Sequence, residues 1–416
     1  MKLFAKKNNY LLFAFLFFVI FSPHISIFNL TIKTVYLFVV IPAMLGLIYS
    51  LQQNHLPKYI KITVLLMIFS LVYNVLIYLL HGFVDLSWII QILMGFIEIF
   101  AAIFVGNIYV NIYKNEALNK IIVHLFYVGI IHSILMLIIF LSPSFRDLFY
   151  SFVKLTELAY NATFRTDNQT RFSGFLNSGF GSLSVLNALM FLMGLYSYMF
   201  IKKISFTNFI SGSILLLISS ILSGRIGIVI MLIVLSIFLL VPTLKLSIFK
   251  RKLKILLIIV PLILIFVILL NFYFPDKAQF AFETYFKYLD TGKLDNSSES
   301  ILSENLNPNL SYLEKLFGTG NYTIDYADSG YIIMINGGGI IGTIVSYSFL
   351  LSTSSLKQLN FKNKYRYILI LLTLIIVFIN YKNLYFFGYN DVFQIYFLIT
   401  CTAAILEYKK SKYEII

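Results

Sequence analysis

Charged residues are scarce in this sequence. Asp, Glu, Lys and Arg make up 12% of its 416 residues, while hydrophobic residues make up 59%. A soluble globular domain carries about 25% charged residues. The composition therefore excludes a soluble protein of one or two domains and indicates a polytopic membrane protein.

Cysteine and histidine are scarce as well. Cys401 is the single cysteine, which excludes a disulfide within the chain and a cysteine-rich metal site. None of the five histidines follows His132, and none has metal-ligand spacing with a carboxylate. A nucleotide-binding glycine loop is also missing from the sequence. We therefore expect no metal, no cofactor and no direct use of ATP.

Long apolar runs dominate what is there. Because a bilayer-spanning helix needs about 20 mostly apolar residues, we predict an all-α protein with about twelve such helices. They form a single integral membrane domain over residues 1–416. No clear cleavage site follows the first run, so we interpret it as a membrane helix rather than a signal peptide. The predicted spans are 9–28, 34–51, 62–80, 88–111, 121–142, 178–201, 205–222, 225–241, 254–274, 329–351, 366–381 and 390–407.

The basic residues follow a topological pattern. A net charge of +14 would suit nucleic acid, but the lysines gather in short loops between apolar runs, so we expect no nucleic-acid partner. With a cytoplasmic N-terminus, most of the 32 basic residues fall on the inner side and most of the 18 acidic residues on the outer side. The positive-inside rule thus predicts that both termini are cytoplasmic.

Two long outer loops are predicted at residues 143–177 and 275–328. Each has apolar residues at helical spacing, which is typical of helices in the membrane interface, although packing within the loop would give the same pattern. The residues concerned are Phe145, Leu148, Phe149, Phe152 and Leu155 in the first loop, and Phe282, Tyr285, Phe286 and Leu289 in the second.

Arg225 is the first candidate for chemistry. It stands in "ILSGRIGIV", a tight turn between two predicted spans, with Ser223, Gly224 and Gly227 around it. An arginine that snorkels at a helix end would need no such small neighbours. Small residues let a ligand come close, and a guanidinium binds phosphate through two parallel hydrogen bonds. We interpret Arg225 as a phosphate-binding residue and Ser223 as a substrate contact.

Arg171 is the second candidate. The segment "TRFSGFLNSGFGS" leads from the first long loop into the sixth span, and Asn177 lies within it. The N-terminus of a helix favours anions, so an arginine beside one makes a credible phosphate site. Arg165 is a possible helper, although a solvated loop arginine would look the same.

The carboxylates offer two further candidates. Glu98 lies within the fourth span, where a carboxylate either pairs structurally or contacts substrate. Asp328 lies where the second long loop enters the tenth span, and Asp325 precedes it. Two arginines for an anionic leaving group and an aspartate for a proton form a coherent transferase arrangement. Tyr331 and Asn336, in the glycine-rich run that follows, are candidate substrate contacts.

Three of these segments resemble a known family. "LFGTGNY…DSGYIIMINGGGIIG", "RFSGFLNSGFGS" and "SGRIG" are together similar to the bacterial O-antigen polymerases of Wzy type, within the O-antigen ligase/polymerase superfamily. The resemblance implies a GT-C-like, metal-independent glycosyltransferase in the bacterial inner membrane, with its site open to the periplasm. It implies undecaprenyl-pyrophosphate-linked oligosaccharides as donor and acceptor, and a chain-length regulator protein is a candidate partner.

The resemblance also suggests roles for single residues. Arg171 and Arg225 match the arginines that engage pyrophosphate, and Asp328 stands where the ligase branch usually has a histidine. That departure favours polymerase over ligase. The second loop lacks a frequent arginine after "NSS", which leaves a third phosphate contact unassigned. The alternatives are an O-antigen ligase and a flippase or exporter of lipid-linked oligosaccharide, although a flippase would carry charges deep in several spans.

Overall fold

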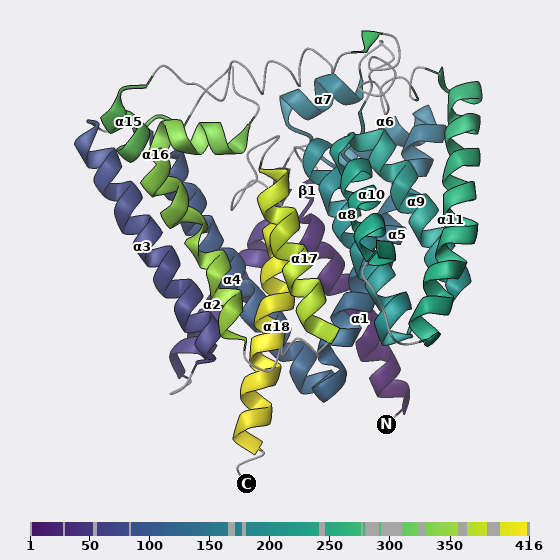
Figure 1. Cartoon of the computed structure of the whole chain (residues 1–416), viewed down its shortest axis with the longest axis horizontal. Coiled ribbons are helices and arrows are strands. Elements are labelled where there is room, and N and C mark those ends of the chain that lie inside the picture. The colour runs from purple at the N-terminus through teal and green to yellow at the C-terminus, as the bar shows by residue number, and fades with distance from the viewer. Residues whose placement is uncertain are drawn as a thin grey trace. The chain divides into compact units, whose positions relative to one another are not determined.

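The protein is an all-α multi-pass membrane protein with one small β-hairpin (Figure 1). The computed structural model describes residues 2–27, 30–52, 56–82, 85–164, 171–176, 180–240, 246–275, 278, 291–292, 310–322, 329–356, 364–380 and 392–413. Within these residues, six helical stretches are long and apolar enough to cross a membrane. Further apolar helices are shorter, among them Ile226–Leu240 and Tyr365–Ile379.

The chain divides into two compact units. Unit 1 consists of Met1–Phe38 and Asn119–Lys293, and unit 2 of Val39–Leu118 and Leu294–Ile416. Unit 1 contains α1 (Lys2–Phe21), β1 (His24–Ile27), β2 (Leu30–Lys33), most of α5 (Ala117–Leu141), α6 (Pro143–Phe152), α7 (Glu157–Thr163), α8 (Phe180–Tyr196), the π-helix η3 (Ser197–Ile201), α9 (Phe206–Ser223), α10 (Ile226–Leu240) and α11 (Leu246–Tyr273).

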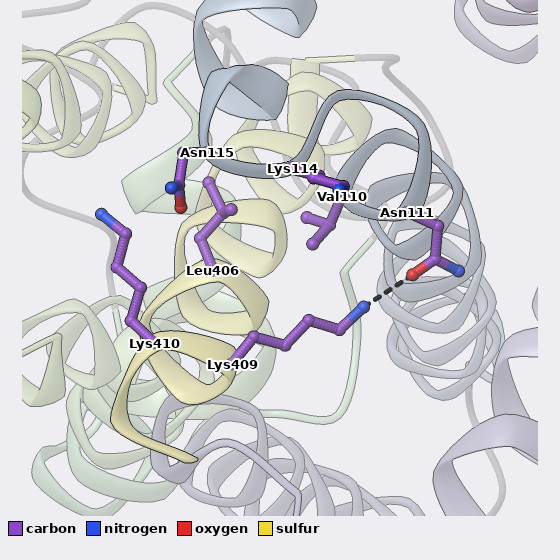
Figure 2. Close-up of a pocket in the computed structure, with 7 residues that line it drawn as sticks. All are labelled: Val110, Asn111, Lys114, Asn115, Leu406, Lys409 and Lys410. Atoms are coloured by element: carbon purple, nitrogen blue, oxygen red, sulfur yellow. Dashed lines mark hydrogen bonds between the residues drawn. The ribbon is translucent and has the colours of Figure 1, made fainter. Parts of the chain in front are cut away.

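Unit 2 is built around α4, with α2 and α18 packed along it. Close packing needs small residues: a Cβ at Gly106 of α4 would lie 2.7 Å from the Thr402 hydroxyl of α18. At the end of the same pair, the Lys409 ammonium donates to the side-chain oxygen of Asn111 at 2.6 Å (Figure 2). The elements are the end of the π-helix η1 (Tyr36–Val40), α2 (Ile41–Gln52), α3 (Lys58–Leu80), α4 (Ser87–Tyr113), the 3-10 helix η2 (Lys114–Glu116), α15 (Tyr312–Phe317), α16 (Gly330–Tyr347), the 3-10 helix η4 (Ser348–Ser355), α17 (Lys364–Ile379) and α18 (Val392–Tyr413).

The first predicted span ends earlier than expected. We predicted a helix to residue 28, but α1 ends at Phe21. Pro23 disfavours helical backbone at the residue before it, and Ser22 has a φ of 34°. The chain then forms the antiparallel hairpin β1–β2, with His24 opposite Lys33. The apolar composition of this stretch did not indicate the turn after Phe21.

The first long loop contains two helices of its own. Helix α6 covers Phe145 to Phe152 of the predicted amphipathic segment, but Leu155 lies beyond its end. Leu148 and Phe152 are about half exposed, at 57% and 55%. Phe149 instead packs inward, with its ring 5.1 Å from that of Phe175. The helix therefore has one exposed apolar edge and one packed edge. The apolar residues 282–289 of the second loop lie outside the described residues.

The glycine-rich run of α16 is covered by the chain itself. The Thr319 N–H donates to the carbonyl oxygen of Asn336 at 2.8 Å, and the Gly320 N–H donates to that of Gly337 at 2.9 Å. Gly339 interrupts the helix with a φ of 70°. A Cβ at Gly339 would lie 2.3 Å from the carbonyl oxygen of Leu316. The glycines thus permit a close approach of the end of α15 and of the segment that follows it.

Candidate functional site

The turn that carries Arg225 joins α9 to α10. The Gly224 N–H donates to the carbonyl oxygen of Ser220 at 2.7 Å, which ends α9. Ser223, predicted as a substrate contact, is fully buried, and its hydroxyl donates to the carbonyl oxygen of Ser219 at 2.8 Å. Arg225 follows directly and is partly exposed.

Ser184 of α8 fixes the shape of this turn. Its hydroxyl donates to the carbonyl oxygen of Gly224 at 2.6 Å and accepts from the Gly227 N–H at 2.8 Å. The two bonds hold the backbone on both sides of Arg225. A Cβ at Gly227 would lie 2.0 Å from the carbonyl oxygen of Ser184, so only glycine permits this approach. The small residues around Arg225 therefore serve packing against α8.

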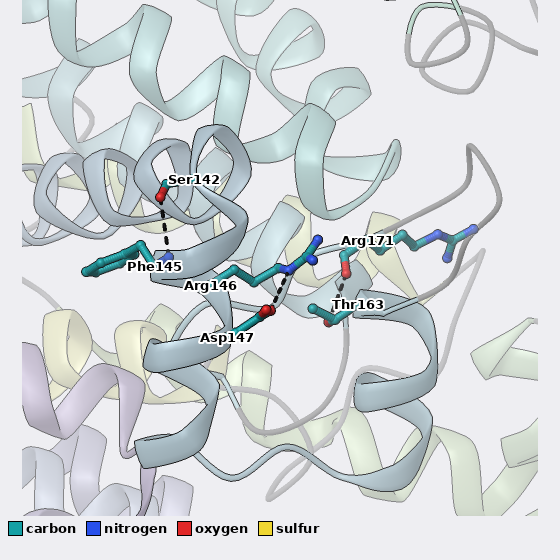
Figure 3. Close-up of polar contacts among 6 residues, drawn as sticks. All are labelled: Ser142, Phe145, Arg146, Asp147, Thr163 and Arg171. Carbon is teal, nitrogen blue, oxygen red and sulfur yellow. Dashed lines mark hydrogen bonds and ion pairs between the residues drawn. The ribbon is translucent and has the colours of Figure 1, made fainter.

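Arg171 lies on a segment that is bonded to the same turn. The Phe172 N–H donates to the carbonyl oxygen of Leu222 at 3.0 Å, so the residue after Arg171 is joined to one three positions before Arg225. On its other side, the Arg171 N–H donates to the carbonyl oxygen of Ala162 at 3.0 Å. The Thr163 hydroxyl donates to the Arg171 carbonyl at 3.0 Å (Figure 3). Two segments far apart in sequence thus bring the two arginines to one region of unit 1.

His132 and Tyr150 hold the residues after Arg171. The His132 Nε2 accepts from the Phe175 N–H at 3.3 Å, and the Tyr150 hydroxyl accepts from the Gly174 N–H at 3.2 Å. Gly174 has a φ of +58°, and a Cβ there would lie 2.4 Å from His132 Nε2. Burial raises the pKa of Tyr150 to about 12, which favours the neutral phenol further. Both side chains position the arginine segment.

A third arginine lies beside this segment. Arg146 of α6 contacts Asp147 at 3.4 Å (Figure 3). Its guanidinium lies 5.2 Å from the ring centre of Phe164. Phe164 follows Thr163, which bonds Arg171 directly. Sequence reasoning did not single out Arg146, because one charge on an amphipathic loop helix is normally a solvated one. Ser184 and Tyr150 were missed as well, since single hydroxyl residues in apolar surroundings carry no pattern.

Three candidate residues belong to unit 2. Glu98 is buried in α4, with 5% of its surface exposed. The Tyr331 hydroxyl donates to the carbonyl oxygen of Val377 in α17 at 2.6 Å. Asn336 is buried, and its carbonyl accepts from the Thr319 hydroxyl at 3.0 Å. Tyr331 and Asn336 therefore both bond to other parts of the chain.

The remaining predicted site residues are Asp328, Arg165 and Asn177, and all three lie outside the described residues. Asp325 does too. Among the residues that the structure does describe, no group of three or more His, Cys, Asp or Glu side chains is arranged to hold a metal ion. The described part of the predicted site therefore consists of Arg171 and Arg225, on two segments joined by the backbone bond from Phe172 to Leu222, with their supporting side chains.

Comparisons of this chain with protein-family models, with curated proteins and with solved structures gave no match.

Proposed function

We propose that this chain is a glycosyltransferase that polymerises undecaprenyl-pyrophosphate-linked repeat units at the periplasmic face of a bacterial inner membrane, in a fold of about twelve spans. The observation that supports this most is the bond between Phe172 and Leu222, because it joins the segments of Arg171 and Arg225. Two guanidinium groups on adjoining segments suit a pyrophosphate, which presents several oxygens to bidentate donors.

The reaction that we propose is the glycosyl transfer that the family resemblance implies. A hydroxyl of the acceptor sugar attacks the anomeric carbon of the donor, and the bond from that carbon to the pyrophosphate oxygen breaks. The lipid pyrophosphate leaves with the electron pair of the broken bond, and Arg171 and Arg225 stabilise its charge. Asp328 takes the proton of the attacking hydroxyl.

Arg146 is our candidate for the third phosphate contact. The second long loop lacks the arginine that the resemblance would supply. The Arg146 guanidinium contacts the ring of Phe164, and the neighbouring Thr163 bonds the Arg171 carbonyl. Its contact with Asp147 is exposed, with side-chain exposures of 25% and 63%, and exposed pairs contribute about 1 kcal/mol or less. A phosphate could therefore replace that contact at small cost.

Arg225→Ala tests the proposal. With purified protein and lipid-linked repeat units, we expect polymer formation to be lost while protein abundance stays near normal. Arg225→Lys should also be impaired, because one ammonium cannot reproduce the fork of a guanidinium. The matched control is Arg366→Ala, which removes an arginine from α17 of unit 2. Normal polymer length in the Arg225→Ala variant would contradict the phosphate role.

A deletion strain separates the alternatives. Loss of a polymerase leaves single repeat units on the surface lipid, and loss of a ligase leaves long chains on the polyprenyl carrier. Loss of a flippase leaves neither in the periplasm. Profiling the surface polysaccharide of the strain therefore tests the reaction class without depending on any single residue.

A further inference from the structure

A basic pocket lies at the end of α4 and α18 in unit 2. It has a volume of about 760 Å³ and is lined by Lys114, Lys409 and Lys410 together with Asn111 and Asn115 (Figure 2). No carboxylate is among its described lining residues. Three ammonium groups around one hollow create a site that favours an anion.

Lys409 is not simply a lysine that extends from a helix end into water. Lys409 donates to the side-chain oxygen of Asn111 at 2.6 Å and to that of Asn107 at 3.4 Å. These bonds fix its ammonium between the two helices, beside the hollow. Figure 2 shows the Asn111 side-chain nitrogen turned away from Lys409, and Lys410 extending along the opposite side of the pocket. The pocket therefore combines an anchored charge at Lys409 with the further cations Lys114 and Lys410.

An apolar crevice adjoins the pocket through Lys409. Its lining includes Ile60 of α3, Ile103 of α4 and Ile405 of α18, along with Tyr49 and Tyr408. The α4 and α18 stretches are both long and apolar enough to cross a membrane. A ligand that reaches both places would carry an anionic group and an apolar chain.

We propose that this pocket binds the phosphate headgroup of an anionic membrane lipid, with an acyl chain against the crevice. Phosphate is the shared chemistry of two sources, a lipid headgroup and free phosphate. The adjoining apolar lining favours the lipid, since basic pockets between membrane helices suit anionic headgroups. This site is independent of the proposed glycosyl transfer, because its residues belong to none of the groups assigned to that reaction.

The test uses the full chain in nanodiscs of phosphatidylcholine with a minor share of phosphatidylglycerol, and native mass spectrometry after release. We expect the protein to retain phosphatidylglycerol preferentially. The double variant Lys409→Gln/Lys410→Gln should lower this retention roughly tenfold or more. The matched control Lys61→Gln/Lys203→Gln removes the same charge at exposed positions outside the pocket and should retain the lipid.

A second variant guards against misfolding. Lys114→Gln keeps the bonds of Lys409 and should still weaken lipid retention, with an unchanged elution profile. Equal retention in all variants, or equal loss in the pocket and control variants, would overturn the proposal. In a separate arm, protein in neutral detergent is heated with inorganic phosphate. Stabilisation by phosphate that the pocket variant abolishes, without any lipid preference, would assign the site to free phosphate and overturn the lipid assignment.

Discussion

At the scale of single residues, Ser184 controls the turn that presents Arg225. Its hydroxyl bonds the backbone of both Gly224 and Gly227. Ser184→Ala would leave a buried carbonyl and a buried N–H without this partner, at a cost of about 1–3 kcal/mol. Because small displacements of a catalytic group are costly, we expect turnover to fall about 10- to 100-fold.

Ser213→Ala is the matched control for this prediction. Ser213 is also buried, but its hydroxyl bonds only the carbonyl oxygen of Phe209 in its own helix, at 2.6 Å. Its loss should leave turnover close to that of the unchanged protein. Polymer formation and thermal stability are measured side by side. Equal activity loss in both variants would show that Ser184 acts through general stability and not through the Arg225 turn.

The second prediction at this scale concerns Asp328. General-base assistance contributes about 10²–10⁴-fold, so Asp328→Asn should slow turnover by about that factor. Donor binding should persist, because the arginines are unchanged. Asp325→Asn should have a milder effect. The assay measures donor binding and turnover separately with purified protein. Normal turnover, or loss of donor binding, would remove Asp328 as the base and make Asp325 or Glu98 the next candidate.

At the scale of elements, the break in α16 depends on one glycine. Gly339 and Gly82 both have positive φ, at +70° and +72°, but only Gly339 has close neighbours. Left-handed backbone costs a non-glycine residue roughly 1–2 kcal/mol. We expect Gly82→Ala to lower stability by about that amount. Gly339→Ala should lower it further, because its Cβ would also meet the Leu316 carbonyl oxygen at 2.3 Å.

Thermal unfolding of both variants in detergent measures the difference. The comparison isolates the steric effect, since both glycines lie in unit 2 and share the backbone effect. A Gly339→Ala variant as stable as Gly82→Ala would mean that the end of α15 can move away from α16 without loss of stability.

The apolar runs predicted the helices well, because burial in lipid requires long apolar segments whatever the tertiary contacts. The predicted end of α1 was wrong, because Pro23 disfavours helical backbone at Ser22 although the apolar pattern continues to Phe28. In the site, the sequence drew attention to both arginines and their small neighbours. It gave no sign of Ser184 or Tyr150, because a contact between distant segments leaves no local pattern. The sequence suggested Asn336 as a substrate contact but did not indicate its neighbours in the chain, which are Thr319 and Gly320.

At the scale of the whole molecule, the number of spans remains a prediction. Six described stretches qualify by length and composition, and one of them, Ser87–Leu141, contains both α4 and α5. Shorter helices such as Ile226–Leu240 reach the membrane thickness less easily, since a helix rises only about 1.5 Å per residue. The prediction of twelve spans with cytoplasmic termini rests on the alternation of basic and acidic loops along the chain.

Cysteine labelling tests that topology directly, because the chain has one native cysteine and Cys401 is buried. In a Cys401→Ala background, the positive-inside rule predicts that Ser151→Cys and Tyr312→Cys face the periplasm. These two should react with a membrane-impermeant maleimide once the outer membrane is opened. Lys61→Cys and Lys203→Cys should react only after the inner membrane is opened too. All four positions are exposed, so burial within the protein would not explain a failure to label. Labelling of Lys203→Cys together with Ser151→Cys would mean that the number of spans between them is even, and the twelve-span arrangement would have to be abandoned.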